Sequence, residues 1–382
     1  MGTRSRLPLY GEPIFRWRGR GVLSRQDGTD ESVSFTAQQL KAGEIVIDTR
    51  GTLIPMFETR PLSLVGTTHD GHRIEFLGLR LSHSNSPLGQ GGRSRQTSTN
   101  WYALSVRVTK KTSSQPHEIV AGLVNCEIQL RPSPVAIRAG HATVHLTQRS
   151  DYDTALARAR YQNSAMLMAN AHCEIGRASV RTRLKLLEDI CRLLSFARGT
   201  VINWIFYEVR SAKGETLESV HGNRVTRRFS PLAPIRMDDT AEFVEHALPI
   251  LLADRQYRLR RVISSVHDAK VSGFLETRAL AACVTVEYLV TRFGLTRSKR
   301  WNAKPLRYRL EFMNREACLG LRQQSISWLV DLRNQLAHEA SFLPGRAKWK
   351  QYLRAITLMD TMFARLLRYK GPIVNQVIEW NR

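Results

Sequence analysis

The spacing of apolar residues changes along the chain, and this change constrains the fold more than any other feature of the sequence. Up to about residue 150, apolar residues alternate with polar ones or form short runs, such as "SVSF", "EIVID" and "RIEFLGLRL", between turn-forming stretches. This pattern is typical of β-strands. From "DDTAEFVEHALPILLADR" onward, apolar residues recur every three or four positions, as on one face of a helix. The sequence therefore predicts an α+β protein, with a β-rich region over residues 1–235 followed by an all-α helical bundle over residues 236–382.

The expected elements can be bounded more closely. Helical spacing predicts helices over residues 239–252, 256–270, 273–293, 307–320, 323–338 and 347–369. A helix over residues 178–196 and a strand pair, "TVINWIFYEV" and "RVTRRFS", are expected just before the boundary. The connector over residues 82–100 is rich in Ser and Gly and carries Arg93 and Arg95. We expect it to be a mobile loop, for which contact with a phosphate backbone is one role.

The charge of the chain indicates an anionic partner. Lys and Arg total 57 against 33 Asp and Glu, which gives a formal net charge of +24, and 46 of the basic residues are arginine. Arginine forms paired hydrogen bonds with phosphate or carboxylate, and nucleic acid is the commonest partner of such basic chains. A basic surface that only keeps the protein in solution is the alternative. The excess runs through the whole sequence, so no single basic tail explains it.

Cysteine usage and hydropathy restrict the class of protein further. The five cysteines are scattered without a C-x-x-C pair, which argues against a zinc ribbon and a disulfide framework. "LPLYGEPIFRW" near the start is too broken by Pro, Gly and charge for a signal-peptide core, and the longest apolar stretches fall far short of the roughly 20 residues of a spanning helix. His69 and His72 in "HDGH" lack further metal ligands in the sequence. We expect a cytoplasmic protein that contacts no membrane.

The stretch "RNQLAH" on the predicted helix 323–338 groups the residue types of a polar site. Arg333 and His338 are about 140° apart around the helix, and Asn334 lies between them, about 40° from the histidine. Asn334 and His338 are also an i, i+4 pair, so the amide could orient the imidazole. The alternative is an ordinary surface arginine and a hydrogen-bonded histidine near a helix end.

An acidic residue on the preceding predicted helix bears on the same site. Glu287 shares a face of helix 273–293 with Leu280, Cys283 and Val284, where a carboxylate needs a cationic or hydrogen-bonding partner. Arg333 or His338 could be that partner. A structural pair with another arginine, or exposure at the helix edge, is the alternative.

These residues resemble the HEPN helical domains, many of which are metal-independent ribonucleases. Their signature is an arginine, usually followed by a polar residue such as asparagine, and then a histidine after four to six intervening residues; "RNQLAH" has four. The arrangement resembles ApeA-type proteins of bacterial anti-phage defence, which join a β-rich N-terminal region to a HEPN bundle. "GFLETRALAACVTVEYLV" (273–290) is similar to that family's preceding helix, and "LLEDICRLLSFARGTVI" (186–202) to a segment late in its N-terminal region. The resemblance is good over about residues 240–370 and loose elsewhere.

Spacing alone does not single out this motif. With 46 arginines and 11 histidines, about four matches are expected by chance, and Arg138 with His145 and Arg260 and Arg261 with His267 are such matches. The asparagine, the position near the end of a bundle and the preceding helix distinguish "RNQLAH" from them.

The resemblance implies an endoribonuclease in anti-phage defence, with Arg333, Asn334 and His338 at its site. A histidine, with an ordinary pKa of about 6.5, can take a proton from a ribose 2′-hydroxyl or give one to a leaving 5′-oxygen, while an arginine stabilises charge on the phosphate. This chemistry needs no cofactor and no metal. One histidine cannot easily make both proton transfers, and HEPN ribonucleases typically pair two motifs, so we expect a homodimer.

The resemblance leaves the N-terminal region with a sensing role. We expect it to bind an activating molecule, either phage-derived or a nucleotide. The alternative function is a non-enzymatic nucleic-acid-binding or assembly protein that uses the bundle for dimerisation.

Overall fold

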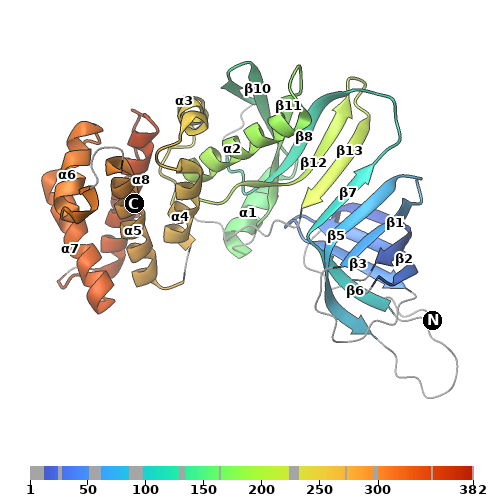
Figure 1. Cartoon of the computed structure of the whole chain (residues 1–382), viewed down its shortest axis with the longest axis horizontal. Coiled ribbons are helices and arrows are strands. Elements are labelled where there is room, and N and C mark those ends of the chain that lie inside the picture. Colours follow the sequence, from blue (N-terminus) through green and yellow to red (C-terminus); the bar gives the residue numbers. More distant parts are fainter. Residues whose placement is uncertain are drawn as a thin grey trace. The chain divides into compact units, whose positions relative to one another are not determined.

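The computed structural model confirms the α+β class, with strands concentrated toward the N-terminus and helices toward the C-terminus (Figure 1). It describes residues 13–24, 28–50, 62–85, 98–128, 134–162, 165–222, 232–271, 273–295, 300–345 and 347–380. The predicted loop arginines Arg93 and Arg95 and the whole of the predicted strand "RVTRRFS" lie outside the described residues.

The chain forms two compact units that do not follow a single cut at residue 235. One unit comprises residues 1–126, 146–184 and 203–226, and the other comprises residues 127–145, 185–202 and 227–382. Helix α2 (Val180–Arg198) explains the difference, because all of it from Lys185 onward belongs to the helical unit. The ring of Phe196 lies 5.5 Å from that of Phe243 and 4.7 Å from that of Phe363. Apolar contact across a long sequence separation cannot be recognised from local spacing.

The first strands of the N-terminal unit close on themselves. They are β1 (Pro13–Ser24), β2 (Asp30–Leu40), β3 (Ile45–Arg50), β4 (Leu62–Thr68), β5 (Arg73–Asn85) and β6 (Ser98–Ala103). They pair in the order β4-β1-β2-β3-β6-β5, and β4 also pairs with β5, so the ring is closed (Figure 1). Closure leaves no unpaired edge among these strands.

Apolar side chains at alternate positions of these strands fill the inside of the barrel. Phe35, Ile47, Phe76 and Trp101 are fully or almost fully buried there. On β2 the neighbours of Phe35, Ser34 and Thr36, are exposed on the outside. Gly19 is required where β1 meets β4, because a Cβ at this position would lie 2.1 Å from the carbonyl oxygen of Thr67. The β-rich prediction is thus realised as a barrel with its own core.

The sheet of this unit continues from β5 through further antiparallel strands. They are β7 (Ser105–Thr109), β13 (Thr216–Gly222), β12 (Asn203–Ser211), β8 (Pro116–Val124) and β11 (Leu167–Glu174), in that order. The partner of β12 is therefore β13, which lies before the predicted segment "RVTRRFS". Helix α1 (Tyr152–Gln162) packs against β11.

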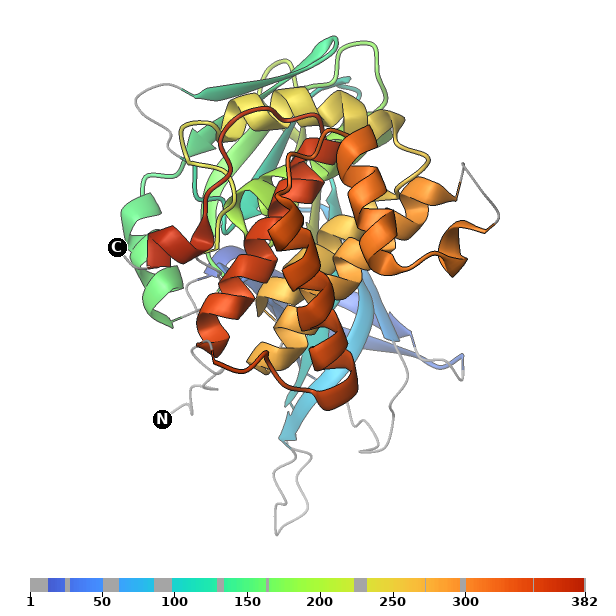
Figure 2. The same ribbon diagram turned by 90° about the vertical axis from the view of Figure 1, so that its left-hand side faces the viewer.

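The helical unit is a bundle around α5. Besides most of α2, its helices are α3 (Thr240–Ala253), α4 (Leu259–Val271), α5 (Leu275–Gly294), α6 (Leu306–Glu316), α7 (Gln323–Glu339), α8 (Lys348–Leu366) and α9 (Gln376–Trp380). The unit also contains a 3₁₀ turn at Trp301–Ala303 and strand β9 (Val135–Ala139). Strand β10 (Ala142–Gln148) belongs to this unit up to His145 and to the N-terminal unit from Leu146. Helix α5 contacts α4, α6, α7 and α8, and Figures 1 and 2 show these helices packed side by side. The predicted helices 239–252 to 347–369 correspond to α3 to α8.

Two structural observations bear on the remaining sequence predictions. Among the described residues, no helix combines the length and apolar character needed to cross a membrane. The described cysteines form no disulfide: Cys126, Cys173, Cys191 and Cys283 are buried, and Cys318 is exposed.

Candidate functional site

The predicted site residues Arg333 and Glu287 lie against each other between α7 and α5. The Arg333 Nε donates a hydrogen bond to the Glu287 Oε2 at 3.1 Å. Both side chains are about half-buried, with 30% and 28% of their surface exposed. Such a charge-assisted bond fixes the plane of the guanidinium and leaves several of its five N–H donors for another acceptor.

A second arginine, which the sequence did not single out, completes the cluster from α6. The Arg309 Nη2 lies 3.8 Å from the Glu287 Oε1, and its Nη1 donates to the Thr291 Oγ1 at 3.1 Å. Only 8% of the Arg309 side chain is exposed. Two guanidinium groups therefore flank one carboxylate, which leaves a net positive charge at the cluster.

The floor of the cluster is apolar. Cys283 lies one helical turn before Glu287 on α5 and is almost completely buried. Burial raises the pKa of the Cys283 thiol to about 12, while the nearby Arg333 lowers it and Glu287 raises it further. The thiol is therefore protonated near neutral pH and is not a nucleophile. Val284, predicted on the same stripe, is instead 52% exposed and lines a cavity between α4 and α5.

The amide of Asn334 does not orient the histidine. Its Oδ1 instead accepts a long hydrogen bond, 3.4 Å, from the Arg333 Nη1. Within the described part of the chain, His338 makes no side-chain hydrogen bond, and its side chain is exposed. The predicted contact between Asn334 and His338 is therefore absent, and the i, i+4 spacing alone was not sufficient to predict it.

The end of α7 separates the histidine from the arginine. The helix stays regular to Glu339 and ends at Ala340, whose left-handed φ of 50° stops it. Arg333 and His338 are therefore about 140° apart around α7 and about 7.5 Å apart along it. Thus the structure groups Arg333, Asn334 and Glu287 with Arg309, while His338 stands apart on the exposed last turn.

The competing arginines and histidine of α4, Arg260, Arg261 and His267, lack this arrangement. Arg260 forms a two-bond ion pair with Asp189 at 2.7 and 2.8 Å, so its guanidinium is already engaged. His267 is only 4% exposed and lies inside the bundle, whereas Arg261 is exposed. A buried histidine and an engaged or outward-facing arginine cannot act together on one phosphate.

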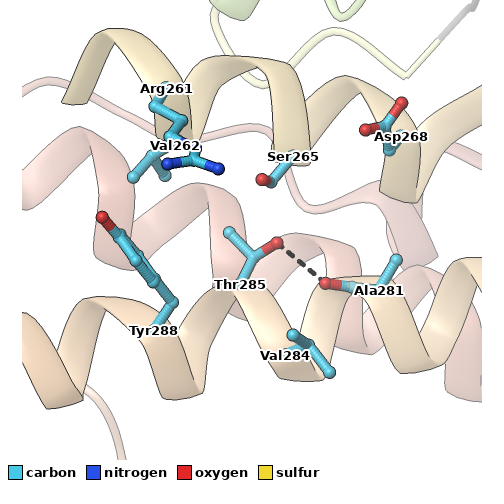
Figure 3. Close-up of a pocket in the computed structure, with 8 residues that line it drawn as sticks. All are labelled: Arg261, Val262, Ser265, Asp268, Ala281, Val284, Thr285 and Tyr288. Atoms are coloured by element: carbon cyan, nitrogen blue, oxygen red, sulfur yellow. Dashed lines mark hydrogen bonds between the residues drawn. The ribbon is translucent and has the colours of Figure 1, made fainter. Parts of the chain in front are cut away.

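A cavity of about 400 Å³ lies between α4 and α5. Figure 3 shows Arg261 and Ser265 on α4 pointing toward the side of α5 that carries Thr285 and Tyr288, and Asp268 further along α4 also lines the cavity. The Thr285 Oγ1 donates to the carbonyl oxygen of Ala281 at 2.8 Å. Glu287 and Tyr288 are consecutive, so the two side chains leave α5 about 100° apart. Helix α5 thus lines the cavity with one face and the arginine cluster with another.

No arrangement of metal ligands was found among the residues that the structure describes. No three His, Cys, Asp or Glu side chains there come close enough together to hold a metal ion. His69 is exposed in the turn after β4, and His72 is half-buried.

The geometry of the cluster suits binding of a phosphate more than attack by a protein nucleophile. It offers a positioned guanidinium with vacant donors, a buried second guanidinium and no ionised thiol. Proton transfer would have to come from His338. Comparisons with known proteins give no match, since neither a protein-family model, nor a curated protein, nor a solved structure is sufficiently similar to the chain.

Proposed function

We propose that this protein is a metal-independent endoribonuclease of the HEPN type, in which Arg333 binds the scissile phosphate and His338 transfers protons. The observation that carries the proposal is the contact of Arg333 with Glu287 beside Arg309, which is an oriented cation on the motif "RNQLAH". The resemblance to ApeA-type proteins supports a role in anti-phage defence.

The proposed reaction uses the 2′-hydroxyl of RNA as the nucleophile. A neutral His338 takes the 2′-hydroxyl proton while that oxygen bonds to phosphorus, and the bond from phosphorus to the 5′-oxygen breaks. The leaving oxygen takes a proton from a second, protonated histidine. The products are a 2′,3′-cyclic phosphate and a 5′-hydroxyl end. Arg333 stabilises the charge that develops on the phosphate oxygens.

Glu287 and Asn334 act through Arg333 in this scheme. Glu287 holds the Nε side of the guanidinium and Asn334 accepts from Nη1, so both are positioning residues. Arg309 places a second positive charge beside the carboxylate of Glu287. The vacant N–H groups of Arg333 then meet the phosphate in a fixed orientation.

The second histidine comes from a second copy of the chain. Exposed apolar side chains at the start of α5 and along it support association, because Phe274, the residue before the helix, is 80% exposed and Val284 is 52% exposed. In such a homodimer the two α7 helices bring two copies of the motif to a shared cleft. The N-terminal unit would then bind the trigger, phage-derived or a nucleotide, that licenses cleavage.

Replacing His338 with alanine tests this proposal. Because the side chain is exposed and makes no hydrogen bond in the described structure, the free energy of unfolding should change by no more than about 0.5 kcal/mol. Cleavage of a labelled RNA should fall by roughly 10²- to 10⁴-fold, the usual contribution of general acid–base catalysis.

The matched control is His267→Ala, which removes a histidine of similar spacing from Arg261. It should lower stability, because His267 is buried, but leave the cleavage rate per folded molecule unchanged. Full activity in His338→Ala together with loss of activity in folded His267→Ala would refute the assignment. RNA binding without cleavage by the parent protein would instead favour the non-enzymatic binding function.

A further inference from the structure

Strand β1 carries a row of arginines on the outside of the barrel. Arg16, Arg18 and Arg20 alternate with residues that face inward, and all three side chains are exposed. Alternate residues of a strand are about 7 Å apart on one face. Successive phosphates of an extended single-stranded nucleic acid have a comparable spacing. The row is therefore a linear array of cations with the period of a polyanion.

The neighbouring strand does not neutralise this row. Opposite the arginines, β2 presents only uncharged side chains, in the pairs Arg16 with Gln38, Arg18 with Thr36 and Arg20 with Ser34. On the other side, Arg20 faces Thr67 of β4. In the described part of the chain, no carboxylate lies within ion-pair distance of the three guanidinium groups; Asp70 in the turn after β4 is exposed and makes no ion pair with them.

A fourth cation extends the row across the sheet. Arg50 at the end of β3 is exposed and lies opposite Ser34, in register with Arg20. The nearest acid on this face by register is Asp48 on β3, whose side chain is almost buried. Burial raises the pKa of Asp48, while the charge of Arg50 lowers it. The arginines therefore give this face a positive electrostatic potential.

The barrel fixes the strand that carries these arginines, and the arginine side chains are not part of its core. β1 pairs with β2 along its length and with β4 from Gly19 to Ser24, and the carbonyl oxygen of Arg18 accepts a hydrogen bond from the backbone N–H of His69 at 2.9 Å, so its backbone is fixed. The inward neighbour Trp17 stacks on Phe15, with ring centroids 6.0 Å apart, and packs against His221 at 4.8 Å. The arginines therefore project from a rigid strand but contribute nothing to the core, which is the arrangement expected of a binding surface rather than of a structural one.

We propose that the outer face of β1 and β2 binds the sugar–phosphate backbone of a single-stranded nucleic acid. Each arginine would contact one phosphate, and the hydroxyls of Ser34 and Thr36 would add hydrogen bonds to phosphate or sugar oxygens. Contacts of this type are independent of base sequence. The binding does not require cleavage, so it goes beyond the proposed ribonuclease function and survives if that function fails.

The test is the affinity of the full chain for short labelled oligouridylate and oligothymidylate, measured by fluorescence anisotropy in the His338→Ala background so that RNA is not cut. Loss of three phosphate contacts in Arg16→Gln/Arg18→Gln/Arg20→Gln should weaken binding on the order of tenfold. It should also make the slope of log affinity against log salt shallower by about 2.

Two matched variants distinguish the effect of the arginine row from an effect of total charge and from an effect on folding. Lys110→Gln/Lys111→Gln/Lys213→Gln removes the same charge from exposed positions of the same unit, and should change affinity much less. Arg16→Lys/Arg18→Lys/Arg20→Lys keeps the charge, and should retain most of the affinity and the parent slope.

The outcomes are distinct. An unchanged salt slope in the three-glutamine row variant, or an equal loss in the lysine control, overturns the proposal. Strong binding to vesicles of anionic phospholipid with no binding to either oligonucleotide overturns it as well. A preference for oligouridylate or oligothymidylate identifies which nucleic acid the face binds and supports the proposal in both cases.

Discussion

A buried ion pair offers the sharpest test of how the helical unit is held together. The Lys270 Nζ on α4 lies 3.0 Å from the Asp360 Oδ2 on α8, and neither side chain is exposed to solvent. The ammonium also donates to the carbonyl oxygen of Leu232 at 3.1 Å and lies 5.7 Å from the ring centre of Phe196. Burial lowers the pKa of Lys270 and raises that of Asp360 to about 6, and each partner opposes the shift of the other.

Asp360→Asn removes the negative charge and leaves the ammonium in an apolar site. If Lys270 keeps its proton, the lost partner costs roughly 3–5 kcal/mol. If Lys270 instead releases its proton, the cost at about pH 7 follows from its ordinary pKa of 10.5, and is about 5 kcal/mol at 1.36 kcal/mol per pH unit. Both routes predict a loss of several kcal/mol.

The pH dependence has a definite sign. Because the pKa of Lys270 is depressed in the folded variant, stability is lost as pH falls below the unfolded value of 10.5. By the same arithmetic, the deprotonation cost at about pH 9 is only about 2 kcal/mol, so the deficit of Asp360→Asn should shrink by up to about 3 kcal/mol between pH 7 and 9. In the parent protein both partners are present, and Lys270 and Asp360 stabilise each other's charged form.

Denaturant unfolding followed by helical circular dichroism measures these differences. Lys270→Met/Asp360→Leu, which replaces both charges with apolar groups, should recover most of the loss. Asp331→Asn is the control, because Asp331 pairs with Arg307 at 3.3 Å on the surface, with about half of each side chain exposed, and should cost no more than about 1 kcal/mol. A loss below about 1 kcal/mol for Asp360→Asn, equal at both pH values, would refute the reasoning.

Two further predictions concern the proposed site. Glu287→Gln should slow RNA cleavage at least about tenfold and lower the free energy of unfolding by roughly 1–3 kcal/mol, because the buried Arg309 loses its carboxylate partner. Glu287→Asp should recover part of the cleavage rate. A full cleavage rate in Glu287→Gln would show that Glu287 has no part in the mechanism. Sedimentation at micromolar concentration should show a dimer that Phe274→Glu/Val284→Glu dissociates with loss of cleavage, and a monomer that still cuts RNA would contradict the shared cleft.

The helices could be predicted because their information is local. Helices α3 to α8 each bury one stripe of regularly spaced apolar residues, and their observed ends differ from the predicted ones by a few residues. Strand β1 could not be predicted in this way. Three of its outward positions are arginines, and the inward positions Gly19 and Gly21 interrupt the apolar alternation that Phe15 and Trp17 begin. Its partners, β2 and β4, supply the burial that its own sequence lacks.

The same distinction applies within the candidate site. Glu287 could be noticed from the sequence because an acid on an apolar stripe needs a partner, and in the structure it contacts Arg333. Arg309 could not be identified, since nothing local distinguishes it among 46 arginines until α6 packs on α5. The orientation of Asn334 depends on the position of the Arg333 guanidinium, which Glu287 sets from another helix.

The separation of Arg333 from His338 would give the proposed homodimer a mechanistic reason. Arg333 turns toward α5, where Glu287 holds it, while His338 lies on the exposed last turn of the same helix, about 140° away. Cleavage needs a base and an acid on opposite sides of the phosphorus, and one chain offers one histidine in this motif. A second α7 placed against the first would supply the missing histidine and bring a second oriented arginine to the same phosphate. In the proposed enzyme, dimerisation would therefore assemble the catalytic groups and not only stabilise the fold.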